Sequence, residues 1–421
     1  MVYVMKIKVS YLFKILLVFS FFLFGYSVFA DTNFERWKYE FRQFAITQGI
    51  SARTVDSALH GLLLDPKIIE NDTHQAEFVK PIWKYLESAV SKQRVQRAKK
   101  LLQKHQVLLD KIEKKYGVQR EYILAIWGIE SNYGSNYGNK NVIRSLATLA
   151  YQGRRKEFGK TQLLAALRLI EQGDIAPGQM IGSWAGAIGQ TQFIPTTHEQ
   201  YAVDFDGDGV RNLIQSIPDA LASTANYLAK FGWQKNQAWG QEVHLAKHFD
   251  WSMVDYKTGL NVGCWKHIGI IPMQPLSESQ RKQAASLLLP AGHKGPIFLI
   301  QHNFNVIKRY NNANSYALAV SYLSNQMLNK TGVTTSWPND DVMLTRVERQ
   351  NLQQILSQSG FDTQGIDGRI GPNTRAALRA WQRKENLVAD GYINKKRFEY
   401  LKKMANKHPS STLVTHDKKE M

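Results

Sequence analysis

The stretch YILAIWGIESNYGSNYG, residues 122–138, joins a helical apolar pattern to a carboxylate at its end. Ile123, Ile126 and Ile129 recur every three residues around Trp127, which is typical of the buried face of a helix. Glu130 follows where Ser, Asn and Gly break the pattern, beside the negative end of the helix dipole. Two interpretations are open at this point. Glu130 is a solvated residue of the last turn, or its position raises its pKa as a general acid requires.

The composition predicts a folded chain in anionic surroundings. With 421 residues, 43% of them hydrophobic, the chain is long enough for about two folded units. Lys and Arg number 54 against 35 acidic residues, a formal charge of +19. Such an excess favours nucleic acid, an anionic lipid surface or an acidic polymer as partner. Cys264 is the only cysteine, so no internal disulfide is expected, and its surroundings VGCWKH suggest a buried apolar role.

The N-terminus predicts export. Three lysines precede an apolar run at residues 15–30 that ends with the small residues Val28 and Ala30. This layout is typical of a secretory signal peptide, with cleavage before Asp31 and a periplasmic mature protein. The run is short for a transmembrane span, and an uncleaved N-terminal membrane anchor is the alternative. Export argues against nucleic acid and points to an acidic material outside the cytoplasm.

The rest of the chain is mainly helical in pattern. Apolar residues at helical spacing fill most of residues 31–149 and return at 315–328. Residues 241–301 mix Gly, Pro, His and β-branched residues, which predicts short strands or loops. We expect the following domains: signal peptide 1–30, large domain 31–335, linker 336–343, small domain 344–405 and polar tail 406–421.

A glycine-rich loop, GSWAGAIGQTQFIP, offers the chemistry of a sugar site. Its glycines let backbone approach a ligand closely. Ser183, Gln190 and Gln192 supply neutral donors and acceptors for hydroxyl and acetamido groups, while Trp184 and Phe193 offer faces on which sugar rings stack. The alternative for this loop is a tight contact between helices through small residues.

Three segments in this order, GIESNYG, GSWAGAIGQTQFIP and YAVDFDGDG, resemble the lytic murein transglycosylase B family. The resemblance extends from about residue 35 to residue 326. It implies a mainly α fold, with a lysozyme-like helical catalytic domain and minor β or loop insertions. It also implies cleavage of peptidoglycan between N-acetylmuramic acid and N-acetylglucosamine, with a 1,6-anhydro-muramoyl end as product.

By this resemblance Glu130 is the catalytic residue, first as acid and then as base. Ordinary glycosidases use two carboxylates, and a second is not evident, because Glu157 lies in the charged segment GRRKEFG. A hydrolytic muramidase and a non-catalytic wall-binding scaffold are the alternative functions. The implied substrate-binding residues are Arg154, Arg155, Ser183, Gln192, Phe193, Tyr227, Tyr310, Asn311 and Tyr316. For the tyrosines, ordinary core packing is the alternative.

The loop DFDGDGVRN begins like an EF-hand. Its twelfth position is Gln215 in place of the usual bidentate Glu, and in the resembling family a downstream Asp completes the cage. We expect a structural Ca²⁺ and no organic cofactor; a solvated acidic turn is the alternative. The predicted ligands are the carboxylates of Asp204, Asp206, Asp208 and Asp219 and the carbonyl of Val210.

The C-terminal segment GIDGRIGPNTRAALRAWQRKENL resembles the small three-helix peptidoglycan-binding domain. Thr374, Leu378 and Phe398 are its expected core residues, and Asn373 and Asn394 its expected helix caps. Such a domain raises the local enzyme concentration on an insoluble polymer; a small helical domain without a ligand is the alternative. The expected partners are glycan strands of peptidoglycan, with wall-synthesis proteins unidentified. We expect a monomer.

Overall fold

The computed structural model describes residues 32–74, 80–255 and 259–407. The predicted signal peptide and nearly all of the predicted polar tail therefore lie outside the described residues. Within them, every helix is too short or too polar to cross a membrane.

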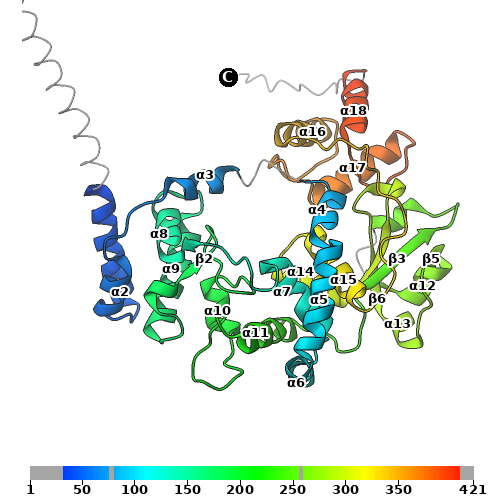
Figure 1. Cartoon of the computed structure of the whole chain (residues 1–421). Coiled ribbons are helices and arrows are strands. Elements are labelled where there is room, and N and C mark those ends of the chain that lie inside the picture. The colour runs from blue at the N-terminus through cyan, green and yellow to red at the C-terminus, as the bar shows by residue number, and fades with distance from the viewer. Residues whose placement is uncertain (1–31, 75–79, 256–258, 408–421) are drawn as a thin grey trace, which may run out of the picture.

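An N-terminal group of helices encloses its own hydrophobic core, at the left of Figure 1. Residues 32–47 are helical and end before Gly49, and the Ser51 side chain accepts a hydrogen bond from the Thr54 N–H to begin the next helix. The later members are α2 (Ala52–Leu59), α3 (Pro66–His74), α8 (Val142–Gln152) and α9 (Lys156–Glu171).

A second core is built around α7 (Arg120–Ser131). The sequence predicted one buried face, but all residues from Tyr122 to Gly128 are buried, so α7 is a central helix with neighbours on every side. Gly128 is required there, because a Cβ would lie 2.6 Å from the ring of Tyr133. The surrounding helices are α4 (Ile82–Ala89), α5 (Lys92–Lys104), α6 (Gln106–Tyr116), α11 (Ile217–Lys230), α14 (His302–Tyr310) and α15 (Asn314–Met327).

A five-stranded antiparallel sheet forms the β insertion, which confirms the prediction of strands at 241–301. Its strand order is β4-β6-β7-β3-β5, and Phe298 of β7 pairs with Glu242 of β3 and Leu288 of β6. Its strands and helices are β3 (Gly240–Leu245), β4 (Leu260–Asn261), α12 (Val262–His267), β5 (Ile270–Pro272), α13 (Glu278–Lys282), β6 (Ala284–Leu288) and β7 (Ile297–Gln301). Cys264 is exposed on α12; the buried role predicted for it is wrong, because Val262 and Trp265 supply the buried face.

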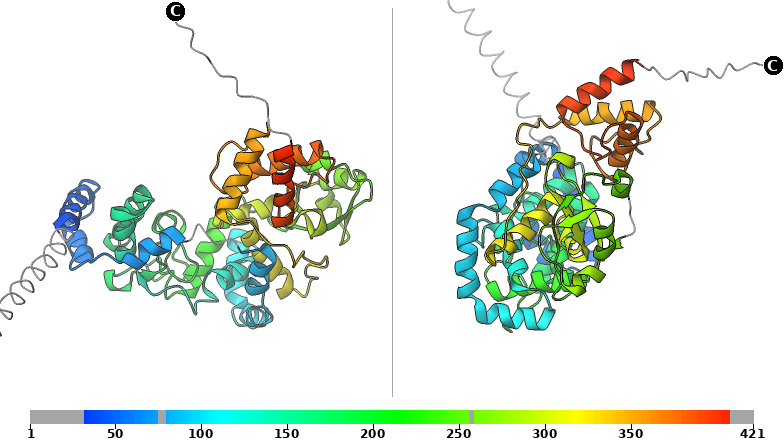
Figure 2. Two further views of the ribbon diagram at one scale, coloured as in Figure 1. Left: turned by 90° about the horizontal axis from the view of Figure 1, so that it is seen from above. Right: turned by 90° about the vertical axis from the view of Figure 1, so that its right-hand side faces the viewer.

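The C-terminal unit is a small bundle of three helices with its own core. The predicted core residues Thr374, Leu378 and Phe398 are buried. Its helices are α16 (Arg346–Gln358), α17 (Pro372–Lys384) and α18 (Lys395–Lys407). Figure 2 shows them (orange and red) at one edge of the molecule, beside the loops of the sheet.

Specific contacts attach this unit to the rest of the chain. The buried carboxylate of Asp390 accepts hydrogen bonds from the backbone N–H and the ring Nδ1 of His293, at 3.0 and 2.6 Å, and from Arg397 at 2.9 Å. Burial opposes ionisation of Asp390, but the His293 and Arg397 contacts outweigh it and lower its pKa to about 2. Trp83, Ala291 and Tyr392 form a small apolar cluster across the same interface. The two units are therefore held in a fixed relation.

Candidate active site

Glu130 lies in the last turn of α7, where the helix ends because Asn132 adopts a left-handed backbone conformation with φ 50°. Protein surrounds the carboxylate, while part of the residue stays accessible. This burial raises the pKa of Glu130 to about 7, and a hydrogen bond from the Tyr316 hydroxyl to Oε1, 2.6 Å long, opposes the rise. The shift of its pKa from an ordinary 4.5 to about 7 favours the second of the two early interpretations, because a general acid works best with a pKa near neutral pH.

Aromatic side chains from four elements gather next to Glu130. The rings of Tyr310 and Tyr316 are stacked, with centroids 6.3 Å apart. Phe193 lies 5.7 Å from both Tyr310 and Tyr227. The hydroxyl of Tyr310 donates to the Thr191 carbonyl at 2.6 Å, which fixes the ring on the glycine-rich loop.

Phe193, Tyr227 and Tyr310 line a hollow of about 220 Å³, and Tyr316 does not. Gln192, Phe193, Tyr227 and Tyr310, all predicted as substrate-binding residues, are on its wall. Tyr310 connects this hollow to Glu130, because its ring stacks on that of Tyr316, whose hydroxyl contacts the carboxylate. Flat apolar faces with polar edges are the surfaces on which sugar rings stack.

The glycine-rich loop is folded tightly against α7. At Gly189, with φ 71°, a Cβ would lie 2.4 Å from the Leu213 carbonyl, so only glycine fits there. Gln190 accepts from the indole N–H of Trp127 at 3.1 Å and donates to the Ile214 carbonyl at 3.1 Å. Gln190 is thus a structural clamp. Gln192 follows with φ 54° and donates to the Tyr137 and Gly189 carbonyls, both at 2.9 Å. The strands β1 (Lys140–Asn141) and β2 (Ile181–Gly182) and the helix α10 (Pro195–Tyr201) flank this loop.

The other predicted residues do not line this hollow. The Ser183 hydroxyl accepts from the Ala187 N–H at 2.9 Å within the loop's own turn. Asn311 is exposed where α14 ends, directly after Tyr310. Arg154 and Arg155 meet the buried carboxylate of Asp72 and line a different cleft, against the C-terminal unit.

Sequence reasoning did not find Tyr85 of α4. Burial, and then the charge of Glu130, raise its pKa to about 12, so it is close enough to sense that carboxylate. Only the ordinary amphipathic pattern of α4 surrounds it in the sequence, and no signal there marks it. No second carboxylate is among the groups that shift the pKa of Glu130.

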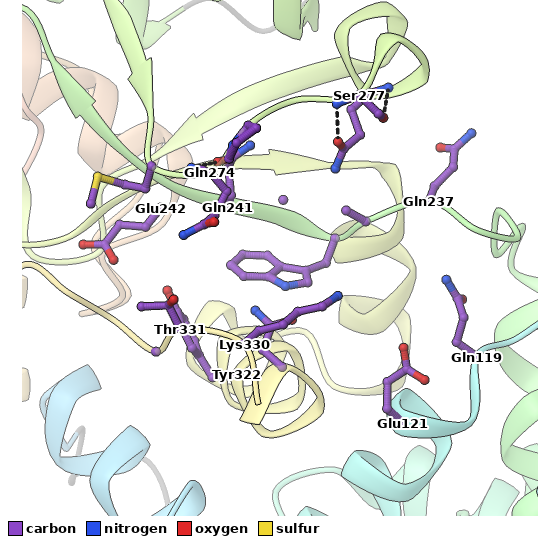
Figure 3. A pocket seen from close by; sticks show the side chains of 18 of the residues that line it. Gln119, Glu121, Gln237, Gln241, Glu242, Gln274, Ser277, Tyr322, Lys330 and Thr331 are labelled. Atoms are coloured by element: carbon purple, nitrogen blue, oxygen red, sulfur yellow. Dashed lines mark hydrogen bonds between the residues drawn. The ribbon is translucent and has the colours of Figure 1, made fainter. Parts of the chain in front are cut away.

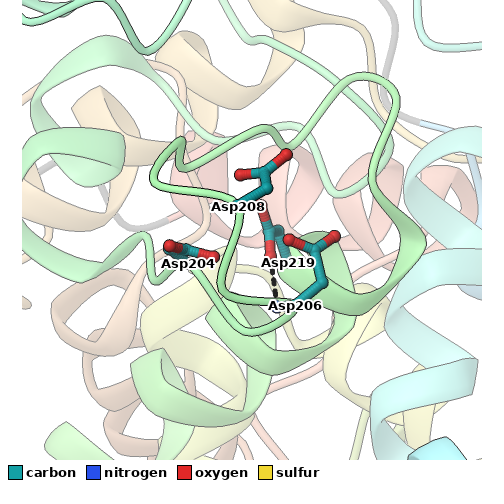
Figure 4. Close-up of side chains that lie close together, drawn as sticks. All are labelled: Asp204, Asp206, Asp208 and Asp219. Carbon is teal, nitrogen blue, oxygen red and sulfur yellow. Dashed lines mark hydrogen bonds between the residues drawn. The ribbon is translucent and has the colours of Figure 1, made fainter.

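Three aspartates of the loop before α11 converge with Asp219, which lies in the first turn of α11 (Figure 4). The carboxylate oxygens of Asp204, Asp206, Asp208 and Asp219 lie within 4.8 Å of one another. Asp219 is completely buried, which raises its pKa. Among the described residues none of the four forms an ion pair with Lys or Arg, and such a set of oxygens matches the preference of Ca²⁺. The donor set therefore fits a calcium ion.

A larger hollow of about 600 Å³ opens at the other end of α7 (Figure 3). Gln119 and Glu121 line it, nine or more residues before Glu130 and therefore roughly 14 Å away along the helix axis. Its polar groups are largely engaged: Glu242 accepts from Thr334 and Thr335, and Ser277 closes a capping box. This hollow is separate from the site around Glu130.

Comparisons with known proteins agree with this geometry. Residues 33–325 match the transglycosylase SLT domain family, and residues 345–401 match a peptidoglycan binding domain family. The chain is 49% identical to SltB3 of Pseudomonas aeruginosa, solved in complex with NAG-anhNAM-pentapeptide; the match covers 88% of this chain and 99% of that one, with a TM-score of 0.85.

Two Escherichia coli proteins are also similar. Membrane-bound lytic murein transglycosylase B of strain K12 is 36% identical over 211 residues, which is 49% of this chain and 56% of that protein's length. The chain thus spans little more than half of that relative. The structure of the lytic transglycosylase Slt35 in complex with calcium is 28% identical, with a TM-score of 0.59, and the match covers 69% of this chain and 92% of that one.

Proposed function

Because the chain belongs to the transglycosylase SLT domain family, we propose that it is a lytic transglycosylase that cleaves peptidoglycan between N-acetylmuramic acid and N-acetylglucosamine, leaving a 1,6-anhydro-muramoyl end. The observation that carries this proposal is the carboxylate of Glu130, which protein surrounds and whose pKa is raised to about 7, close to the tyrosines that lead to an aromatic hollow. A general acid is most effective when its pKa lies near the working pH.

The proposed mechanism uses Glu130 twice. Protonated Glu130 gives its proton to the glycosidic oxygen as the bond from that oxygen to muramic C1 breaks, and the muramic N-acetyl group assists the departure. The ionised carboxylate then takes the proton of the C6 hydroxyl while O6 bonds to C1. Glu130 ends protonated as it began, and no water is consumed. The hydroxyl of Tyr316, bonded to Oε1, stabilises the ionised form between the two steps.

The aromatic hollow would hold the sugars during these steps. Tyr310, which is partly exposed, would offer its ring face to a sugar, and the buried rings of Phe193 and Tyr227 would hold Tyr310 in place. Gln192 is fixed by its hydrogen bonds to two backbone carbonyls. Ser183 and Asn311 are proposed to contact the glycan strand at sugars farther from the reacting bond. Asn311 is exposed directly after Tyr310. Arg154 and Arg155 are proposed to meet acidic groups of the substrate away from Glu130.

We further propose that Asp204, Asp206, Asp208 and Asp219, with the Val210 carbonyl, hold a structural Ca²⁺. Neutralising the clustered carboxylates would fix the loop from which α11 begins, and α11 packs on α7. The C-terminal unit is proposed to bind peptidoglycan, as its family match suggests. The N-terminal pattern supports a periplasmic location of the mature protein, which we propose to be a monomer.

Mass spectrometry of fragments released from purified peptidoglycan by residues 31–421 tests the main proposal. Muropeptides ending in 1,6-anhydro-muramic acid are expected, because the C6 hydroxyl replaces water as the nucleophile. Fragments with reducing ends would mean a hydrolytic muramidase. Wall binding by folded protein without any product would mean a scaffold.

Replacing Tyr316 with Phe should move the pH profile of the enzyme upward. The hydroxyl of Tyr316 stabilises the charged carboxylate, so its loss raises the pKa of Glu130 further above 7. Since Glu130 must be protonated to start the reaction, kcat/KM falls as pH rises through this pKa. Loss of a hydrogen bond to a charged group is expected to shift this fall by about one pH unit toward alkaline pH.

The measurement is kcat/KM on soluble glycan strands between pH 5 and 9. Tyr85→Phe is the matched control. Tyr85 also lies near Glu130, but the hydrogen bond to the carboxylate comes from Tyr316. A descending limb that stays in place in Tyr316→Phe would contradict the assigned role of this hydrogen bond.

A further inference from the structure

A cleft of about 760 Å³ separates the C-terminal unit from the turn between α8 and α9. Its described walls combine guanidinium groups with apolar side chains such as Leu344, Ile370 and Ile393. Arginines come from both sides of the cleft: Arg154 and Arg155 from the large unit, and Arg346, Arg349, Arg369 and Arg375 from the C-terminal unit.

The positive charge of this cleft is poorly balanced. Among its described lining residues Asp367 is the only carboxylate, and its Oδ1 already accepts from Gln353 and from the Arg369 N–H, at 3.0 and 2.8 Å. Asp72, behind the cleft, is shared by Arg154 and Arg155. Six guanidinium groups thus meet two carboxylates. Burial lowers the pKa of Arg349, and the positive charge of the neighbouring Arg346 adds to this effect.

Some of these arginines are fixed and others are available. Arg349 donates to the Gly368 and Leu344 carbonyls at 2.6 and 2.7 Å, so it supports the wall of the cleft. Arg346 has no ion pair or side-chain hydrogen bond within the described ranges, and Arg369 is exposed. Because the Asp390–His293 contact fixes the two units relative to each other, the cleft is a preformed site.

We propose that this cleft binds the carboxylates of peptidoglycan peptide stems, with arginines of both units contacting one stem. Guanidinium groups pair with carboxylates in bidentate geometry, and the apolar wall suits the alkyl parts of a peptide better than a bare oxyanion. The cleft has the volume of a typical ligand site. The inference rests on the proposed function, because it takes peptidoglycan as the substrate. It gives the C-terminal unit a direct part in placing the strand, beyond raising local concentration.

Calorimetric titration with a synthetic stem pentapeptide tests this assignment. The peptide carries no sugar, so its binding is independent of any cleavage at Glu130. The full chain from residue 31 should bind the peptide with free carboxylates, and binding should be lost when these are converted to amides. Arg346→Gln and Arg369→Gln should each weaken binding by about tenfold, as expected for a lost charge-assisted contact.

Arg155→Gln tests whether the large unit takes part, and Arg281→Gln, exposed on α13, is the matched control that should bind like the wild type. Equal binding of the amidated peptide, or of inorganic phosphate in its place, would overturn the proposal. Unchanged binding in Arg155→Gln would overturn the shared site. Release of anhydro-muropeptides by a protein that does not bind the peptide would overturn this inference and leave the proposed function standing.

Discussion

Glu130→Gln is expected to lower peptidoglycan turnover by about 10²–10⁴-fold, the usual contribution of a general acid–base residue. The amide has nearly the shape of the carboxylate, and its oxygen still accepts from Tyr316, so the site keeps its geometry. It cannot give or take a proton in either step of the proposed reaction. The measurement is the rate of release of soluble anhydro-muropeptides from purified peptidoglycan.

The same variant is expected to be more stable than the wild type at alkaline pH. The folded-state pKa of Glu130 is about 7 against an ordinary 4.5, so between these values the folded state binds more protons than the unfolded state. Wild-type stability therefore falls as pH rises from 4.5 to about 7. The Glu130→Gln variant lacks this loss, and its advantage in the free energy of unfolding at pH 8 is on the order of 3 kcal/mol. Urea unfolding at pH 5 and pH 8 measures it.

Glu40→Gln is the matched control, because Glu40 is exposed in the helix at residues 32–47. It should change neither activity nor the difference in stability between the two pH values. If Glu130→Gln lost activity and stability together, Glu130 would be a structural residue and the catalytic assignment would fall. If Glu130→Gln instead gains stability and loses activity, Glu130 is kept for catalysis at a cost in folding stability.

Local patterns predicted the helices well, and they failed where two local rules competed. Asn394 accepts from the Arg397 N–H at the start of α18, as expected of a helix cap. Asn373 does not cap α17, because Pro372 takes the first helical position and Gly371 the cap. Proline fits that position because its missing N–H is not needed there. The preference of Asn for helix caps could not by itself decide between Asn373 and Gly371.

The candidate site was predictable as a set of residues and not as a set of contacts. Tyr316 and Glu130 are 186 residues apart, so no spacing rule joins them; the family resemblance named both without the bond between them. Arg154 contacts Asp72, 82 residues earlier, and no spacing in the sequence predicted that contact. Such pairs depend on how helices pack, which the apolar pattern of each helix leaves open.

Asp219→Ala is expected to lower the free energy of unfolding by about 3–5 kcal/mol. The side chain is completely buried and accepts from the N–H groups of Phe205 and Asn212 at 2.7 and 2.8 Å, and more weakly from that of Asp206. Alanine would leave these buried donors without an acceptor, at a cost of about 1–3 kcal/mol each. Asp219→Asn keeps one acceptor oxygen and should lose less.

Addition of calcium separates the role of Asp219 as a hydrogen-bond acceptor from its proposed role as a Ca²⁺ ligand. With Ca²⁺ at a hundredfold excess over its Kd, the wild type should gain about 2.7 kcal/mol in urea unfolding and lose this gain in EDTA. Asp219→Asn should show little or no gain, because a neutral amide replaces the buried charged ligand. Asp362→Asn is the matched control, an exposed aspartate that accepts one backbone N–H, from Gln364, and it should respond to Ca²⁺ like the wild type. A wild type whose stability is the same in Ca²⁺ and EDTA would mean that hydrogen bonds alone hold the loop. In that case the four aspartates would form an acidic turn, and α11 would be positioned against α7 without help from a metal.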